Sequence, residues 1–272
     1  MLHKISDIDF KRLSEFMLKK YGINLTQKRT LIEGRLGALI TQRGFNDFKS
    51  FLDMVFADRT GTEMVTLLNK LTTNHTYFYR EPEHYEYMAS TLLPYIEKTK
   101  KDHTFRIWSA GCSSGEEPYT NVMQTLDYFG MKKASWKISL LATDISMRVM
   151  NIAKEAIYSD ESRKHMPTAW KSKYFISQPN NCFKVSPEVT KYVEFKSFNL
   201  MDPIPFKLYK FDLIFCRNVM IYFENKTKIE LVKRFYDVLA PGGHLFIGHA
   251  ESLGRNETDY EYIKPAIYRK PL

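Results

Sequence analysis

The residues between the first predicted strand and the helix after it could bind a charged small molecule. Residues 109–118 read Ser-Ala-Gly-Cys-Ser-Ser-Gly-Glu-Glu-Pro. Glycines and small side chains let the backbone of such a loop approach a ligand closely. The loop lacks the G-x-G-x-x-G spacing of dinucleotide-binding proteins, and Glu116 and Glu117 would repel a pyrophosphate. A ligand that carries positive charge fits this loop better.

The next predicted strand also ends in a carboxylate, Asp144, which could accept hydrogen bonds from both hydroxyls of a ribose. S-adenosyl-L-methionine combines a ribose with an ammonium and a sulfonium, so it matches both positions. Each position also has a purely structural interpretation, in which Glu116 and Glu117 complement a helix dipole and Asp144 caps a helix. Their occurrence at the ends of consecutive strands favours a nucleoside cofactor.

Strands and helices alternate through the C-terminal two thirds of the chain. The strands are predicted at 105–111, 136–144, 192–200, 211–218 and 244–252, with helices at 117–130, 146–156 and 226–239 and a turn at Ala240-Pro-Gly-Gly243. This order is typical of an α/β fold with a doubly wound, mostly parallel sheet that binds ligands at the carboxyl ends of its strands. Residues 171–193 break the rhythm, and they predict a small antiparallel β insertion.

The N-terminal segment has helical periodicity and no strand pattern. Four apolar stripes predict four helices, which reach Tyr21, Ile40, Phe56 and Leu71. Thr60-x-x-Glu63 has the pattern of a capping box at the start of the fourth helix. We therefore predict a helical domain over residues 1–72 and a ligand-binding domain over residues 73–272.

Composition limits the classes of protein and site. The chain has 3 cysteines without C-x-x-C spacing, which argues against a disulfide framework or a zinc site, and we expect no metal. It has neither a signal peptide nor an apolar run of about 18 residues, so we expect a cytoplasmic protein that does not insert into membranes. The net charge of +9 indicates an acidic partner, which could be nucleic acid, an anionic membrane surface or a protein.

Four segments resemble one known family: residues 71–81, 111–119, 192–195 with 199–200, and 211–223; a fifth, 241–252, is similar to the family's last core strands. With these segments the sequence closely resembles the CheR family of chemotaxis receptor methyltransferases over nearly its whole length. The resemblance implies a class I, Rossmann-like S-adenosylmethionine methyltransferase fold. It also implies methylation of receptor glutamates for sensory adaptation, with S-adenosyl-L-homocysteine as the product.

The resemblance also implies which residues form the site. Cofactor contacts are implied at Asn74, Thr76, Arg80, Glu117, Asp144, Asn199, Leu200, Arg217 and Asn218. Arg80 and Tyr222 are implied beside the transferring methyl group, as the catalytic residues. Without the resemblance, Tyr222 would be interpreted as a core aromatic residue. A polar role for Arg217 and Asn218 was already expected, because burial without partners after so apolar a strand would be costly.

The implied reaction needs little acid–base chemistry. A glutamate side chain has a pKa of about 4.3, so it is already a nucleophilic carboxylate at neutral pH and no general base is required. We expect Arg80 to position that carboxylate through a bidentate pair. Tyr222 could shape the pocket, donate a hydrogen bond to the carboxylate or lie against the sulfonium.

The helical domain carries a candidate receptor-binding face. Lys28, Arg35 and Gln42 recur at seven-residue spacing, with Arg29 and Arg43 nearby. Such a face is usually only solvated, but the resemblance implies that this domain meets the methylation helices of the receptor. Lys28, Arg29, Arg35 and Arg43 are therefore the predicted receptor contacts, and we expect a monomer.

Some family members also bind a C-terminal receptor pentapeptide through their small β-subdomain. In this chain the corresponding stretch, Phe175 to Val185, is shorter and lacks a glycine-rich turn. We therefore predict that the enzyme does not depend on the pentapeptide.

Two rival functions remain. A nucleic-acid methyltransferase would place an aromatic pocket near an Asn-Pro-Pro-Tyr-like motif to hold a flipped base, whereas here the strand continues into Cys216-Arg-Asn-Val219, so we expect no nucleic-acid substrate. A noncatalytic module that only binds the cofactor could keep Glu117 and Asp144 while losing Arg80 and Tyr222. Both of the latter residues are present, which favours an enzyme.

Overall fold

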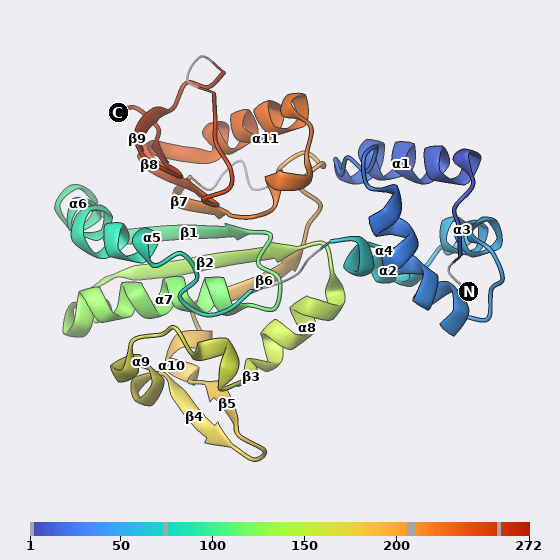
Figure 1. Cartoon of the computed structure of the whole chain (residues 1–272). Helices are drawn as coiled ribbons and strands as arrows, with labels where there is room; N and C mark the ends of the chain where they lie inside the picture. The colour runs from blue at the N-terminus through green and yellow to red at the C-terminus, as the bar shows by residue number, and fades with distance from the viewer. Residues whose placement is uncertain (1–2, 73–75, 206–209, 255–256) are drawn as a thin grey trace. The chain divides into compact units, whose positions relative to one another are not determined.

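A computed structural model describes residues 3–72, 76–205, 210–254 and 257–272. The chain folds into two compact units, and their elements are labelled in Figure 1. One unit comprises Met1–His75 and Tyr222–Lys228, and the other comprises Thr76–Ile221 and Ile229–Leu272. Among the described residues, no helix has the length and apolarity needed to cross a membrane.

The first unit is helical, as predicted. Its helices are α1 (Asp7–Tyr21), α2 (Arg29–Gln42), α3 (Phe48–Ala57) and α4 (Thr62–Leu71). The predicted apolar stripes form its core, where Leu13, Leu36 and Phe51 are fully buried. Helix α1 begins after Ser6, whose hydroxyl accepts a hydrogen bond from the Asp9 amide, and it ends at Gly22 in the left-handed conformation.

The start of α4 differs from the prediction. The predicted capping box is wrong, because Asp58 takes over the capping role. Its Oδ2 accepts from the Glu63 amide at 2.8 Å, and its Oδ1 accepts from the Thr60 amide at 2.8 Å. The N-cap residue is Gly61, which has no side chain to contribute. The helix therefore begins two residues after Thr60.

The second unit is built on a seven-stranded sheet with the strand order β6-β2-β1-β7-β8-β10-β9. The first five strands in that order are parallel, and β10 is antiparallel to both β8 and β9. The predicted mostly parallel sheet is confirmed, whereas β9 and β10 were not predicted. The strands are β1 (Thr104–Ala110), β2 (Lys137–Asp144), β6 (Val193–Ser197), β7 (Phe211–Cys216), β8 (Leu239–Ile247), β9 (Glu261–Lys264) and β10 (Ile267–Arg269).

Strand β8 begins earlier than predicted. The expected turn Ala240-Pro-Gly-Gly243 lies inside the strand as an irregularity, because Phe211 pairs with Leu239 whereas Leu213 pairs with His244. Gly242 has a φ of 73°, which lets the chain take up the extra residues without strain.

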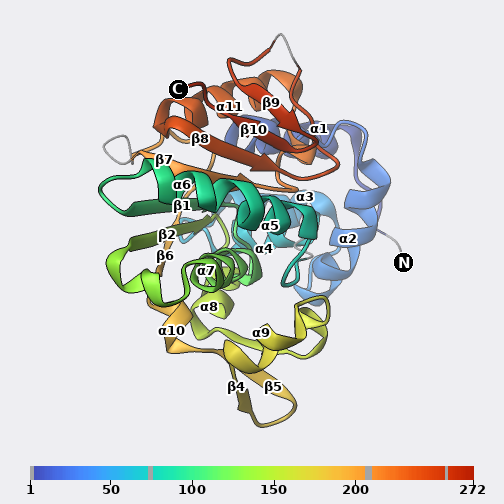
Figure 2. The same ribbon diagram turned by 90° about the vertical axis from the view of Figure 1, so that its left-hand side faces the viewer.

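Helices cover both faces of the sheet (Figures 1 and 2). On β1, Trp108 contacts Phe235 of α11 with ring centroids 5.2 Å apart, whereas Ile107 belongs to the cluster that includes Val122 and Met123 of α7. Because successive strand residues point to opposite faces, α7 and α11 lie on opposite sides. The helices are α5 (Pro82–Tyr87), the π-helical turn Met88–Leu92, α6 (Leu93–Thr99), α7 (Glu116–Phe129), α8 (Met147–Glu155) and α11 (Asn225–Val238), with 3₁₀ turns at Gly130–Ser135 and Met220–Tyr222.

The predicted β insertion is present as a three-stranded antiparallel sheet with the order β3-β5-β4. Its first strand comes from residues before the predicted start at 171, because Ile157 pairs with Lys184 of β5. The elements are β3 (Ile157–Ser159), β4 (Phe175–Gln178) and β5 (Cys182–Val185), with α9 (Thr168–Lys173), α10 (Pro187–Thr190) and a 3₁₀ turn at Glu161–Arg163.

Candidate active site

Polar residues gather where neighbouring parallel strands end. Strands β2, β1 and β7 are adjacent in the sheet, and their carboxyl ends lie at one edge. Asp144 ends β2, Glu117 lies in the first turn of the helix after β1, and Arg217 follows β7. The sheet therefore brings together three predicted site residues that are far apart in the sequence.

Arg217 is the centre of this group. Its side chain is 1% exposed, and its guanidinium donates to Glu81 at 3.0 Å, to Glu117 at 3.2 Å and to the Tyr85 hydroxyl at 3.3 Å. It also donates to the main-chain carbonyl of Arg80. A buried guanidinium needs such a complete set of partners, because an unpaired buried charge is costly.

The ionisable groups around Arg217 shift one another's pKa values. Burial alone would lower the pKa of Arg217, but electrostatic interactions with Tyr85, Glu117 and Glu81 raise it. Burial raises the pKa of Glu117, and this rise is opposed by Arg217 and by the Ser109 hydroxyl, which donates at 2.7 Å. Two carboxyl groups thus flank one buried guanidinium, and the charge of Arg80 also acts on Glu117.

The two adjacent glutamates have different environments. Glu117 points back to Ser109 and Arg217, so it does more than complement the dipole of α7. Glu116 is 5% exposed and accepts from the Ser114 hydroxyl at 2.7 Å. Burial raises the pKa of Glu116 to about 7. The interpretation that both residues serve only the helix dipole is therefore too simple.

Asp144 connects the cofactor loop to the segment after β2. Its Oδ2 accepts from the Ser113 amide at 2.9 Å, and its Oδ1 accepts from the Ser146 amide at 2.9 Å. The N-cap of α8 is Ser146, so Asp144 does not cap that helix directly. A carboxylate has about four acceptor positions, so Asp144 retains capacity for ligand hydroxyls.

The loop that contains Gly115 packs tightly against Ala153 and Tyr158. Gly115 has a φ of +97°, and a Cβ atom there would lie 2.8 Å from both the Ala153 Cβ and the Tyr158 hydroxyl oxygen. That hydroxyl donates to the Ser114 carbonyl at 2.7 Å. The Ser113 Oγ is buried without a hydrogen-bond partner among the described residues. A fixed loop with an unsatisfied hydroxyl suits a polar ligand.

The other predicted cofactor residues vary in their surroundings. Thr76 and Arg80 are partly buried, and the charge of Arg80 acts on Glu117. The Asn199 side-chain oxygen accepts from the Met201 amide at 3.1 Å, and Leu200 is 8% exposed. The Asn218 amide nitrogen Nδ2 lies 3.4 Å from Glu81. Asn74 lies outside the described residues.

Tyr222, the second predicted catalytic residue, belongs to the segment that folds with the first unit. Its carbonyl accepts from the Asn24 amide at 2.8 Å, and the next residue, Phe223, forms a β-bridge with Ile23. No sequence pattern predicted this return of the chain to the helical unit.

Several polar residues of the site were missed by reasoning from the sequence. Glu81 accepts from Arg217, and it has a positive φ of 57°. Arg217 also lowers the pKa of Glu81, although burial acts in the opposite direction. Ser109, Tyr85 and Glu251 were missed as well. The only available signal was that Glu81 and Glu251 lie in segments that resemble the family.

Glu81, His84 and His249 offer ligand atoms that lie within 4.8 Å of one another, as a metal site would. The Arg217 guanidinium already forms an ion pair with Glu81, and its charge would oppose a cation there. Burial, and to a smaller extent the charge of Arg217, lowers the pKa of His84 to about 2, so its ring is neutral. The arrangement fits an ion-paired cluster better than a metal centre.

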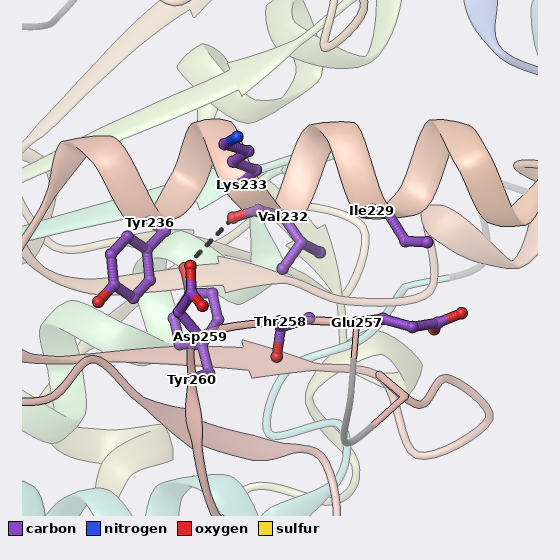
Figure 3. Close-up of a pocket in the computed structure, with 8 residues that line it drawn as sticks. All are labelled: Ile229, Val232, Lys233, Tyr236, Glu257, Thr258, Asp259 and Tyr260. Carbon is purple, nitrogen blue, oxygen red and sulfur yellow. Dashed lines mark hydrogen bonds between the residues drawn. The ribbon is translucent and has the colours of Figure 1, made fainter.

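A cavity of about 300 Å³ opens elsewhere on the second unit, between α11 and the segment before β9 (Figure 3). Figure 3 shows the Tyr260 hydroxyl donating to the Val232 carbonyl across its base. None of the predicted site residues lines this cavity. Its lining residues are Ile229, Val232, Lys233, Tyr236, Glu257, Thr258, Asp259 and Tyr260.

Comparisons with known proteins identify the family of the chain. Residues 8–72 match the all-alpha domain of CheR methyltransferases, and residues 74–268 match their SAM-binding domain. The chain belongs to the CheR methyltransferase family. It is 40% identical over 98% of its length to the chemotaxis protein methyltransferase of Borreliella burgdorferi, of which it covers 95%. It is 33% identical over 97% of its length to the enzyme of Salmonella typhimurium and covers 90% of that protein.

The chain is thus an S-adenosylmethionine-dependent chemotaxis protein methyltransferase. The residues at the strand ends fit that cofactor. The carboxyl groups of Glu81 and Glu117 beside Arg217 suit an ammonium group, and the spare acceptor capacity of Asp144 suits ribose hydroxyls.

The predicted receptor-facing arginines of the helical unit make contacts within that unit. Arg29 pairs with Asp7 at 2.5 Å, Arg43 pairs with Glu63 at 3.0 Å, and Arg35 donates to the Leu71 carbonyl at 2.8 Å. Arg29 and Arg43 each keep about two fifths of their side-chain surface exposed, at 39% and 42%. Lys28 precedes α2, is exposed, and makes no side-chain cap.

Proposed function

We propose that this enzyme transfers the methyl group of S-adenosylmethionine to glutamate side chains of chemoreceptor helices and forms glutamyl methyl esters. The observation that carries the proposal is the hydrogen bond from Arg217 to the Arg80 carbonyl. This bond ties the arginine expected beside the transferring methyl to the centre of the charged group. The bond fixes the main chain at Arg80, from which the guanidinium would orient an incoming carboxylate.

Each charged residue has a defined task in this proposal. Glu117 and Arg217 hold the charged end of the cofactor, Asp144 accepts its ribose hydroxyls, and Asn199 and Asn218 complete the site. Bound S-adenosylmethionine supplies an electrophilic methyl group. Arg80 aligns the receptor carboxylate without neutralising it, because too strong a pair would stabilise the ground state.

The nature of the methylated product tests this function. Receptor-containing membranes are incubated with the enzyme and labelled S-adenosylmethionine, and the labelled protein is then treated with mild alkali. We expect the label to be released as methanol, because an ester hydrolyses under these conditions. Label that survives alkali, or that is found in nucleic acid, would contradict the proposal and would favour a nucleic-acid methyltransferase.

We also propose that the enzyme acts independently of a receptor C-terminal pentapeptide. The supporting feature is the small size of the β3-β5-β4 sheet. Strands β4 and β5 have 4 residues each, and the connection between them includes Asn180 and Asn181, which have positive φ angles. Titration of such a peptide should give no saturable heat signal by calorimetry. Tight binding that is lost on substitution within residues 171–193 would refute this independence.

The receptor encounter is proposed to use the helical unit of a monomeric, cytoplasmic enzyme. Lys28 and Arg43 are exposed, whereas Arg29 and Arg35 are partly buried. Arg29 and Arg43 each pair with one carboxylate, and Arg35 donates to a main-chain carbonyl and keeps its charge. A basic face would raise the rate of encounter with helices that present glutamates.

A further inference from the structure

A buried carboxylate outside the predicted site holds the loop that carries Arg217. Glu251 is 7% exposed, and its side chain is hydrogen-bonded to the main chain of residues 217–221. Its Oε2 accepts from the Asn218 amide at 2.9 Å and from the Gly248 amide at 2.6 Å, while its Oε1 accepts from the Ile221 amide at 3.1 Å. Both oxygens of one carboxylate are therefore committed to main-chain donors.

The sheet explains why one side chain can reach both loops. Strands β7 and β8 are parallel neighbours, and Cys216 at the end of one pairs with Ile247 at the end of the other. The segments that follow them leave the sheet side by side. The converging N–H groups of residues 218, 221 and 248 form a concave anion-binding nest, and Glu251 fills it.

The backbone of the loop needs such support. Asn218 has a φ of 58°, a conformation that non-glycine residues seldom adopt and that persists only when the surrounding structure fixes it. Gly248 allows the close approach, since a Cβ atom there would lie 2.6 Å from the Asn218 Nδ2 and 2.9 Å from the Glu251 Oε2.

We propose that Glu251 is a positioning residue for methyl transfer. By bonding both ends of the 217–221 loop, it sets the orientation of Arg217 and Asn218, and it fixes the residue that immediately precedes Tyr222. Because both oxygens of Glu251 already accept from main-chain donors, Glu251 acts through the loop. This inference rests on the roles proposed above for Arg217 and Tyr222.

The variant Glu251→Gln tests this role, because it affects the hydrogen bonds at the two ends of the loop differently. Glutamine has one acceptor oxygen, which is best used on the two donors at Asn218 and Gly248. Its NH₂ group then faces the Ile221 N–H, donor against donor. We expect kcat for receptor methylation to fall at least tenfold, while the Kd for S-adenosylhomocysteine, measured by calorimetry, changes less than threefold. Glu251→Asp keeps both oxygens and should recover part of kcat.

Asp212→Asn is the matched control. Asp212 is a buried carboxylate near the opposite end of β7, where it accepts from Lys100 at 2.8 Å and from the Arg106 amide at 2.9 Å. Its substitution should lower the Tm without changing kcat per folded molecule. Gly248→Ala is a second test. Its Cβ atom, just after the end of β8, would press on Asn218 of the same loop, so it should lower kcat in the same way even if Glu251→Gln does not fold.

The outcomes are distinct. A Glu251→Gln enzyme with wild-type kcat, or with a loss no larger than that of Asp212→Asn, overturns the inference alone. A wild-type chain that binds S-adenosylhomocysteine but labels no receptor overturns the proposed function, and this inference with it.

Discussion

At the scale of single residues, the site depends on carboxyl groups that are close in the sequence but have different environments. Glu116 and Glu117 are adjacent, yet one is buried beside Ser114 and the other forms an ion pair with Arg217. The types of residue in the site could be predicted from the resemblance. Their partners could not, because Glu81 and Glu251 reach the site only through the fold.

Glu116 should make the stability of the chain depend on pH. Burial raises its pKa to about 7 from an ordinary value of 4.5, so the native state retains a proton that the unfolded state has released. This contribution is full below pH 4.5 and is lost as the pH rises through about 7. The difference in unfolding free energy between wild type and Glu116→Gln should therefore shift by up to about 3 kcal/mol between pH 5 and pH 8.

Urea denaturation of the cofactor-free chain at several pH values measures this difference, with the exposed Glu155→Gln as the control. A difference between wild type and Glu116→Gln that stays constant across the range would show that Glu116 is ionised in the folded chain.

At the scale of elements, periodicity identified the four N-terminal helices and the parallel strands because each buries a regular apolar face. Periodicity failed where backbone geometry or pairing with a distant strand determines whether an element forms and where it begins. Residues 240–243 were predicted as a turn, but an irregularity at Gly242 lets them remain part of strand β8. The short strand Ile157–Ser159 forms because it pairs with β5. The cap of α4 came from Asp58, outside the expected motif.

Gly115→Ala should damage the cofactor loop. An alanine at a φ of +97° is strained, and its Cβ atom would lie 2.8 Å from Ala153 and Tyr158. We expect a loss of about 1–3 kcal/mol of stability, together with weaker binding of S-adenosylhomocysteine by calorimetry.

Gly34→Ala is the matched control, because a Cβ atom at Gly34 in α2 meets nothing within 4 Å. Alanine is the better helix former, so this variant should be as stable as wild type or more stable. If Gly115→Ala unfolds at the same urea concentration as wild type, the loop is less tightly held than the structure indicates.

At the scale of the whole molecule, the division into a helical and an α/β part was predicted from helical stripes that end at Leu71 and from strands and helices that alternate from about Phe105. The return of Tyr222–Lys228 to the helical unit was not, because it rests on a main-chain hydrogen bond and one β-bridge that leave no pattern in the sequence. The net charge of +9 also acts at this scale, since it biases the chain toward acidic partners.

Charge reversal at Lys28 should slow receptor methylation. Lys28→Glu removes an attraction from the predicted receptor-facing helix, so we expect kcat/KM for receptor membranes to fall about threefold or more at low salt and less at high salt. Lys101→Glu makes the same change in net charge at an exposed position of the second unit and should have a smaller effect. Equal losses in the two variants would show that only net charge matters.

The measurement that tests the central claim most directly compares wild type with Arg80→Ala in the transfer of labelled methyl from S-adenosylmethionine to receptor-containing membranes. Base-labile label is scored, and S-adenosylhomocysteine binding is measured in parallel. We predict that wild type labels the receptor, and that Arg80→Ala loses at least 99% of this activity, or about 3 kcal/mol of transition-state stabilisation, while still binding the cofactor product. Arg80→Ala that labels receptors as fast as wild type would contradict the account.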